Sequence, residues 1–240
     1  SYRYTIYNVD SNNWENTISK TGKITSGEIE IAESMNAFID GTIYLNVALT
    51  DDAGNTGSTV TKELEKDTVK PTFSSISFAE EKVSSENETN FNITLEGVEK
   101  ESTVDYEVTD QASGTKAGQK TIDAEPDYSF AADLSSLNDG QLDLTVEVSD
   151  PAGNSVAKTK ELDKDTTLPE LDTVTIKSDN NTGSELAKDG DTVTLEITAN
   201  KDITKPEVSI AGNTDNVSVD GTGTNWSAEY TMSEGDPEGV

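Results

Sequence analysis

Apolar and polar residues alternate along most of this chain. The alternation is clearest at Leu142, Leu144, Val146 and Val148, which fall on one face of a strand because successive side chains point to opposite sides. Short runs of this kind, separated by Gly, Asn, Asp and Ser, predict strands joined by turns. No helical periodicity is seen beyond one turn around residues 133–138. The pattern therefore predicts an all-β protein.

An internal repeat organises the chain. Residues 40–55 read DGTIYLNVALTDDAGN and residues 139–154 read DGQLDLTVEVSDPAGN, 99 positions later. Residues 62–71 (KELEKDTVKP) match residues 160–169 (KELDKDTTLP) at a spacing of 98. A repeat of about 100 residues with several short strands has the size of an immunoglobulin-type sandwich. We therefore predict tandem immunoglobulin-like β-sandwiches in an extended array, with short linkers that end in proline.

The repeat predicts three units. Residues 1–68 are a partial domain without its first strands, in which Tyr4-Thr5-Ile6 corresponds to Tyr106-Glu107-Val108. Residues 69–166 are a complete domain, and residues 167–240 are a variant domain without its last strands. In the complete unit, strands are predicted at 72–78, 90–95, 103–109, 119–123, 127–132, 141–149 and 156–162. In the third unit they are predicted at 171–177, 191–199, 206–211 and 225–231.

Composition excludes several functions. With 17 Lys and Arg against 47 Asp and Glu, the net charge of −30 disfavours binding to nucleic acid or to an anionic lipid surface. The absence of Cys and His removes disulfides, ordinary zinc sites and histidine-dependent nucleophilic catalysis. No apolar run approaches the ~20 residues of a membrane span, so no direct membrane insertion is expected.

Acidic residues gather where the predicted units join. The Asp-x-Ala-Gly-Asn segment is expected to form the last hairpin loop of each unit, beside the incoming linker. The Asp-Gly turn is expected at the opposite end, beside the outgoing linker. Calcium takes about 6–8 oxygen ligands in flexible geometry, so it suits such a cluster. The candidate metal ligands are Asp40, Asp51, Asn55, Glu65, Asp67, Asp139, Asp150, Asn154, Asp163 and Asp165. Because Asp, Gly and Asn also form turns by themselves, turns without any ion are the alternative.

The motif Asp-x-Ala-Gly-Asn followed by Asp-Thr-x-x-Pro resembles the bacterial Ig-like (BIg) repeats of giant secreted and surface adhesins. Residues 51–55 with 67–71, and 150–154 with 165–169, carry the resemblance, and the third unit resembles a second subtype. It implies an extracellular, surface-located extender segment stiffened by Ca²⁺ at the joints. Its partners would be neighbouring repeats of the same chain. A host-cell, surface or glycan ligand would be bound by a tip domain outside this sequence.

Two other functions stay open on the sequence. One is a surface-layer or extracellular filament subunit, and the other is an accessory carbohydrate-binding module of a secreted enzyme. Trp14 and Trp226 are the candidate sugar platforms, although core packing is the expectation for both. Acidic pairs such as Glu80-Glu81 and Asp51-Asp52 are common by chance in so acidic a chain. We therefore expect no catalytic residues and no enzyme.

Overall fold

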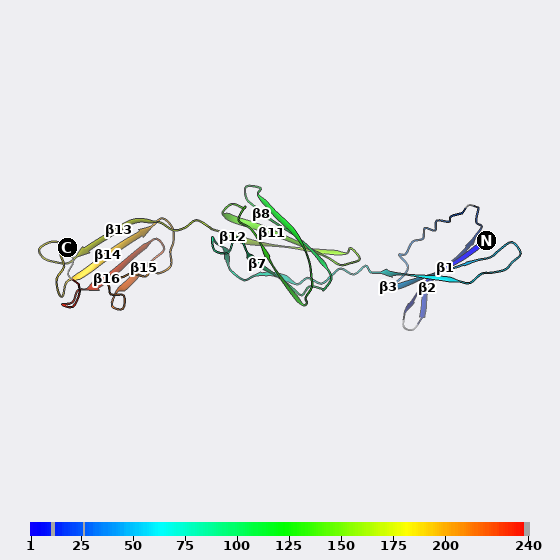
Figure 1. Ribbon diagram of the computed structural model, residues 1–240, viewed down its shortest axis with the longest axis horizontal. Coiled ribbons are helices and arrows are strands. Elements are labelled where there is room, and N and C mark those ends of the chain that lie inside the picture. The colour runs from blue at the N-terminus through cyan, green and yellow to red at the C-terminus, as the bar shows by residue number, and fades with distance from the viewer. Residues whose placement is uncertain (11–12, 26, 238–240) are drawn as a thin grey trace. The chain divides into compact units, whose positions relative to one another are not determined.

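The computed structural model describes residues 1–10, 13–25 and 27–237, without the side chains of residues 9, 10 and 13–15. These residues form strands and turns but no helix, which confirms the all-β prediction. It follows that no described segment is a helix able to span a membrane. The chain divides into two compact units, Ser1–Thr166 and Thr167–Val240 (Figure 1).

The first unit begins with a four-stranded antiparallel sheet that has a small core of its own. Its strands are β1 (Tyr2–Asp10), β2 (Asn13–Gly22), β3 (Gly41–Leu49) and β4 (Val60–Lys66), in the order β2-β1-β3-β4. Tyr4, Ile6, Phe38 and Ile43 form the buried cluster on one face. Tyr4 pairs with Val47 as Tyr106 pairs with Val146 further along, in agreement with the predicted correspondence of these two segments.

The rest of the first unit consists of two sheets that share one hydrophobic core. The smaller sheet has the order β10-β7-β5 and the larger one the order β6-β12-β11-β8-β9. The strands are β5 (Ser75–Phe78), β6 (Lys82–Val83), β7 (Phe91–Glu96), β8 (Thr103–Asp110), β9 (Thr115–Thr121), β10 (Asp127–Ala132), β11 (Gly140–Ser149) and β12 (Ser155–Lys164). We call this part the middle domain. Each predicted strand of this region has an observed counterpart.

The alternation in the sequence becomes a buried face in the middle domain. Leu142, Leu144, Val146 and Val148 of β11 are all completely buried, while the residues between them are exposed. The smaller sheet meets them with Phe91, Ile93 and Leu95 of β7, which are buried to the same degree. Burying side chains of this size contributes about 1.5–3 kcal/mol each, so this core is the main source of the domain's stability.

The second unit is a single antiparallel sheet with the order β13-β14-β16-β15. Its strands are β13 (Leu171–Ser178), β14 (Thr192–Ala199), β15 (Ser218–Thr222) and β16 (Asn225–Thr231). Val208 and Ile210 cover part of one face, where they pack on Ile197, Ala228 and Tyr230.

Two strand predictions for the second unit were wrong. The segment 206–211 is not a strand, because only Ile210 forms an isolated bridge, to Asn213. Strand β15, which has the weak pattern SVDGT, was not predicted. In the middle domain, β8 pairs with β11. No strand equivalent to β11 is described in the second unit, so segment 206–211 lacks the partner strand that β8 has in the middle domain.

Candidate functional site

The Asp-x-Ala-Gly-Asn loop closes on itself through its first and last residues. Asp150 Oδ1 accepts a hydrogen bond from the Asn154 amide, and Oδ2 accepts one from Asn154 Nδ2, both at 2.9 Å. Asp51 and Asn55 form the same pair at 2.8 and 2.9 Å. The glycine of each loop has a left-handed backbone, with φ of 94° at Gly153 and 92° at Gly54. Glycine adopts this conformation without steric cost, which explains why the motif needs it.

The loop of the middle domain also holds the incoming linker. Asn154 Nδ2 donates to the backbone oxygen of Asp67 at 3.2 Å, and the Asp67 carboxylate accepts from the Val69 amide at 2.9 Å. The incoming linker therefore lies beside this loop, as predicted. The contact joins the side-chain amide of Asn154 to the backbone oxygen of Asp67. The carboxylate of Asp67 instead accepts a hydrogen bond within a local turn.

The Asp-Gly turns hold the outgoing linkers. Asp139 accepts from the Thr166 amide at 3.0 Å and from Thr166 Oγ1 at 2.8 Å. Asp40 accepts from the Thr68 amide at 3.0 Å and from Thr68 Oγ1 at 2.8 Å. We call each of these Asp–Thr pairs a linker clamp. The aspartate and the threonine of a clamp are 28 residues apart in the first case and 27 in the second, which explains why Asp-Gly and Asp-Thr recur together in the repeat.

A buried aspartate supports the clamp that Asp139 and Thr166 form. Asp110 accepts from the backbone amides of Ala112 and Gly114, and from both the backbone amide and the side chain of Asn138. Asn138 directly precedes Asp139, so these bonds fix the turn that carries the clamp. Asp110 was not among the predicted site residues, because its partner Asn138 is 28 residues away in sequence. The threonines of the clamps were also missed, although the shared Asp-Thr of both linkers pointed to them.

These hydrogen bonds lower the pKa values of the aspartates. Thr68 holds the pKa of Asp40 below its usual value, first through its hydroxyl and then through its amide. Asn55 does the same for Asp51, and the Asn138 amide does so for Asp110. Burial raises the pKa of Asp150, but the hydrogen bonds from Asn154 and from the amides of Gly153 and Ala152 together outweigh it, so the pKa is lowered overall. All four carboxylates are therefore held in their charged form.

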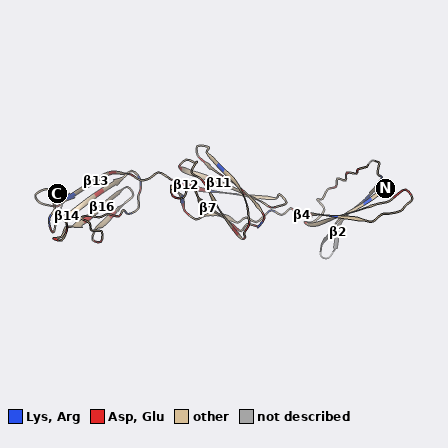
Figure 2. Ribbon diagram, viewed as in Figure 1, with Lys and Arg blue, Asp and Glu red and all other residues tan. Residues whose placement is uncertain are grey.

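The predicted metal ligands are dispersed. Glu65 accepts a hydrogen bond from Thr42 at 3.0 Å, Asp163 is exposed on β12, and the Asp165 amide bonds to the Val83 oxygen at 2.8 Å. Within the described residues, no three acidic side chains gather closely enough to hold a metal ion. Acidic residues are instead spread along the strands and loops of both units (Figure 2). Calcium can also take amide and backbone oxygens, so calcium binding at these residues stays a prediction.

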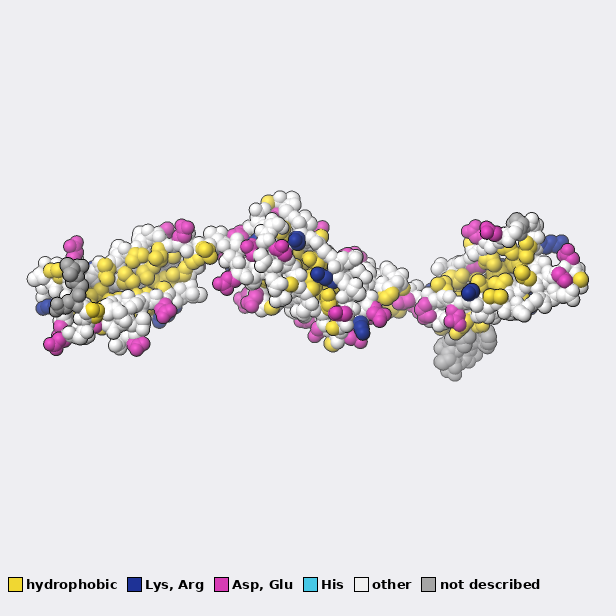
Figure 3. All heavy atoms as spheres, in the orientation of Figure 1, with side chains coloured by type: hydrophobic (Ala, Val, Ile, Leu, Met, Phe, Trp, Pro, Cys, Tyr) yellow, Lys and Arg dark blue, Asp and Glu magenta, His cyan; other side chains and the backbone are white. Residues whose placement is uncertain are grey.

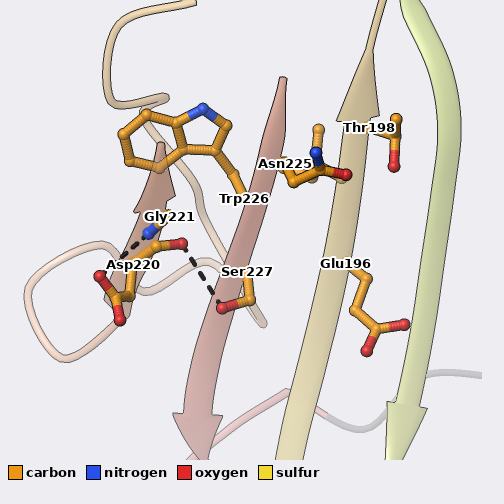
Figure 4. A pocket seen from close by; sticks show the side chains of 8 residues that line it. Glu196, Thr198, Asp220, Gly221, Asn225, Trp226 and Ser227 are labelled. Carbon is orange, nitrogen blue, oxygen red and sulfur yellow. Dashed lines mark hydrogen bonds between the residues drawn. The ribbon is translucent and has the colours of Figure 1, made fainter. Parts of the chain in front are cut away.

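Trp226 is half-buried and packs against the core of the second unit, as expected. Its indole nitrogen donates to the Gly223 oxygen at 3.1 Å. A shallow hollow of about 410 Å³ beside it is lined mainly by polar side chains, including Glu196 and Asp220 (Figure 4). With its ring packed against the core and its N–H bonded, Trp226 is poorly placed to stack on a sugar. The side chain of Trp14 lies outside the part of the chain that the structure describes.

The lowered pKa values predict a loss of stability in acid. A carboxylate whose pKa is lower in the folded state contributes stability above its unfolded pKa, about 3.9 for Asp, and loses it as pH falls through the folded pKa. Asp110→Asn should therefore lower the melting temperature of the middle domain at pH 7, with the difference from the wild type shrinking below about pH 4. Thermal melts at several pH values measure this difference. Asp143→Asn, at an exposed position of β11, is the matched control. A difference for Asp110→Asn that stays constant down to pH 2 would contradict the prediction.

Comparisons with known proteins find similar structures only. No family model matches the chain, and no curated protein matches it. One similar solved structure is a tetra-tandem repeat in the extending region of a large adhesion protein, with 20% identity and a TM-score of 0.41. The match covers 98% of this chain and 56% of that one, so this chain spans little more than half of it. Another belongs to a study of host cell surface retention of a 1.5-MDa bacterial ice-binding adhesin, with 20% identity, a TM-score of 0.38, and coverage of 96% and 76%.

Proposed function

We propose that the chain is a stretch of the extender region of a large bacterial surface adhesin, built from immunoglobulin-like sandwiches in series. The observation that carries this proposal is the linker clamp, which occurs at both predicted ends of a repeat. Asp40 with Thr68, and Asp139 with Thr166, tie a linker to the domain that it leaves. A repeat that encodes its own linker attachment suits a long series of domains better than a single binding module.

The clamp shortens the free linker. After Thr68, only Val69 and Lys70 precede Pro71, which is already buried against the middle domain. Asn154 holds the same linker from the side of the middle domain, through the oxygen of Asp67. Proline further restricts the residue before it. A linker of this kind limits the swing of one domain against the next, which is what an extender requires.

The remaining features support the same role. The charge of −30 disfavours nucleic acid or anionic membrane partners. We propose an extracellular, surface-located protein whose partners are the neighbouring repeats of its own chain. Host-cell, surface or glycan ligands would be bound by a tip domain elsewhere in the protein. We propose no catalytic role for any residue of this chain.

Small-angle scattering of the whole chain tests the extender proposal. The double variant Asp40→Ala and Asp139→Ala removes both clamps without touching a core residue. We expect its distribution of interatomic distances to be broader than that of the wild type, because the linkers gain freedom. The control is Asp143→Ala, an exposed aspartate outside both clamps. A distribution identical to that of the wild type would remove the clamp as the basis of the proposal.

Calcium at the junctions remains a prediction, and the same samples test it. An ion that binds only the folded state must raise the melting temperature as its concentration rises. We therefore expect millimolar calcium to raise the melting temperature and chelation to reverse the change. For an ion to bind, Asp67 or Asp150 would have to exchange its present hydrogen bonds for ion contacts. No response to calcium would reject the ion while leaving the clamps in place.

A further inference from the structure

Asp-Gly dipeptides occur four times in this chain, at residues 40–41, 139–140, 189–190 and 220–221. Such a dipeptide can react with itself, because the glycine amide has no side chain to keep it away from the aspartate carboxyl carbon. Attack by the glycine nitrogen on that carbon closes a cyclic imide, a succinimide, and releases water. Acidic side chains are scattered over the visible face of both units, so a position among carboxylates does not single out one dipeptide (Figure 3).

The carboxyl groups of two of these dipeptides are held by the linker clamps. Asp139 accepts from the Thr166 amide with both oxygens, at 3.0 Å each, and from Thr166 Oγ1 at 2.8 Å. Asp40 also uses both of its oxygens on Thr68. Each carboxyl group has to leave its threonine before its own glycine can attack it. The clamps therefore protect these two dipeptides in the folded chain.

The dipeptide at residues 189–190 is protected at its glycine. The amide nitrogen of Gly190 donates to the backbone oxygen of Met232 at 2.8 Å. This nitrogen has to give up its bond to Met232 before it can attack the carboxyl carbon of Asp189. Reaction at this dipeptide therefore requires a local opening of the second unit first.

The dipeptide at residues 220–221 has its two reacting groups in contact. The Gly221 amide nitrogen lies 3.0 Å from Asp220 Oδ1, to which it donates a hydrogen bond (Figure 4). Oδ1 is bonded directly to the carboxyl carbon that would be attacked, so the nitrogen is near this carbon as well. Holding reacting atoms at about 3–3.5 Å removes much of the entropic cost of bringing them together. The folded geometry therefore favours ring closure at Asp220.

The β15–β16 hairpin requires the glycine of this dipeptide. Gly221 has φ of 141°, in the region that favours glycine. A Cβ atom at this position would meet the Asn225 oxygen and lie 2.7 Å from Trp226 Cα on the opposite strand. A residue with a side chain would hinder the reaction, but it cannot replace Gly221 unless β16 moves. The hairpin thus keeps the reactive dipeptide.

We propose that Asp220 is a site of spontaneous modification, at which the folded chain forms a succinimide and then isoaspartate. The Gly221 nitrogen forms a bond to Cγ of the protonated Asp220 carboxyl group, and the hydroxyl leaves with the amide proton as water. Water then adds to the ring. Addition at Cγ restores aspartate and addition at the backbone carbonyl carbon gives isoaspartate, so water is the sole further reactant. The inference holds whether or not the chain is an adhesin extender.

Isoaspartate at this position would open the β15–β16 hairpin. It carries the chain through the side-chain carbon, which adds one methylene group to the backbone between residues 220 and 221. In the unmodified hairpin, Asp220 pairs with Ser227 and Gly221 pairs with Trp226. The longer backbone shifts the pairs on one side of the modified bond out of register. We therefore expect the modification to loosen β15 and the strand beside it.

Heavy-oxygen water tests the site. The whole folded chain is warmed at neutral pH in this water and digested in ordinary water, and its Asp-Gly peptides are analysed by mass spectrometry. Each ring opening adds one heavy oxygen, and the isoaspartyl peptide separates from the aspartyl one. We expect both signals to appear at Asp220 at least about tenfold faster than at the other three aspartates, which corresponds to about 1.4 kcal/mol in activation free energy. Similar rates at all four aspartates in the folded chain would overturn the proposal.

Unfolding and two variants separate the geometry from the dipeptide itself. In urea the four dipeptides should react at similar rates, because the contacts that distinguish them are lost. Asp220→Glu keeps the charge but has to close a larger ring, so label at this position should fall to background. Thr166→Val removes the hydroxyl of a clamp, so labelling at Asp139 should rise while labelling at Asp220 stays the same. Unchanged labelling at Asp139 would count against selection by these contacts.

Hydrogen exchange of the modified chain tests the consequence. We expect faster exchange in β15 and β16 once isoaspartate has formed, and unchanged exchange in β11 and β12 of the middle domain. Asp220→Glu, warmed for the same time, is the control, since it forms no isoaspartate at this position. Exchange in the hairpin that stays the same after modification would overturn the predicted opening.

Discussion

Replacing Lys164 by methionine is expected to lower the free energy of unfolding of the middle domain by about 3–5 kcal/mol. Lys164 is 4% exposed, and its ammonium group donates to the oxygens of Leu134 and Leu137 at 2.9 and 2.7 Å. It also lies 2.8 Å from the Glu88 carboxylate. Methionine fills a similar volume, so the loss reflects two unpaired carbonyls and a carboxylate without its partner.

Hydrogen exchange of β11 and β12 during urea unfolding of the whole chain measures this loss for the middle domain alone. The matched control is Lys66→Met. Lys66 is the equivalent lysine of the first sheet, half-buried, bonded to the Phe38 oxygen and 3.6 Å from Asp40. We expect a smaller effect there because water reaches this pair. A loss below about 1 kcal/mol for Lys164→Met would mean that its partners find water or other donors.

Leu162→Ala is expected to destabilise the middle domain by about 3 kcal/mol, while Leu64→Ala should cost less than about 1 kcal/mol. The two leucines occupy equivalent places on β12 and β4, but they are 6% and 60% exposed. Truncating the buried one leaves a cavity between the two sheets, whereas truncating the exposed one removes atoms that water already contacts.

The same exchange measurement, read on β3 and β4 for Leu64→Ala, tests this pair of variants. Equal losses for the two leucines would mean that Leu64 is covered in solution and would contradict the prediction.

Local sequence patterns predicted most of the strands because strand side chains alternate and turn residues act within a few positions. β11 is the clearest example, since each of its core residues follows the period of two. The same reasoning failed at residues 206–211 and at Ser218–Thr222. Pairing with a neighbouring strand decides whether such a segment becomes a strand, and the pattern of the segment itself carries no record of that neighbour.

The candidate site was predicted in part. The two loops and their nearness to the linkers followed from the repeat and from the expected topology. The partners of each aspartate did not, because a carboxylate suits a calcium ion and a threonine clamp equally well. Asp110 was missed for another reason, since Asn138, which ties it to the clamp, lies in a separate turn 28 residues away in sequence.

By itself, the sequence determined the all-β class, the repeat and the loops that recur with it, because these depend on alternation and turn chemistry within a few residues. Only the tertiary structure decided which carboxylates meet a threonine and which lysine is buried. It also decided that Leu64 is exposed while Leu162 lies in a core. Two nearly identical segments, KELEK and KELDK, thus have different surroundings, since burial depends on the sheet that covers them and not on their own residues.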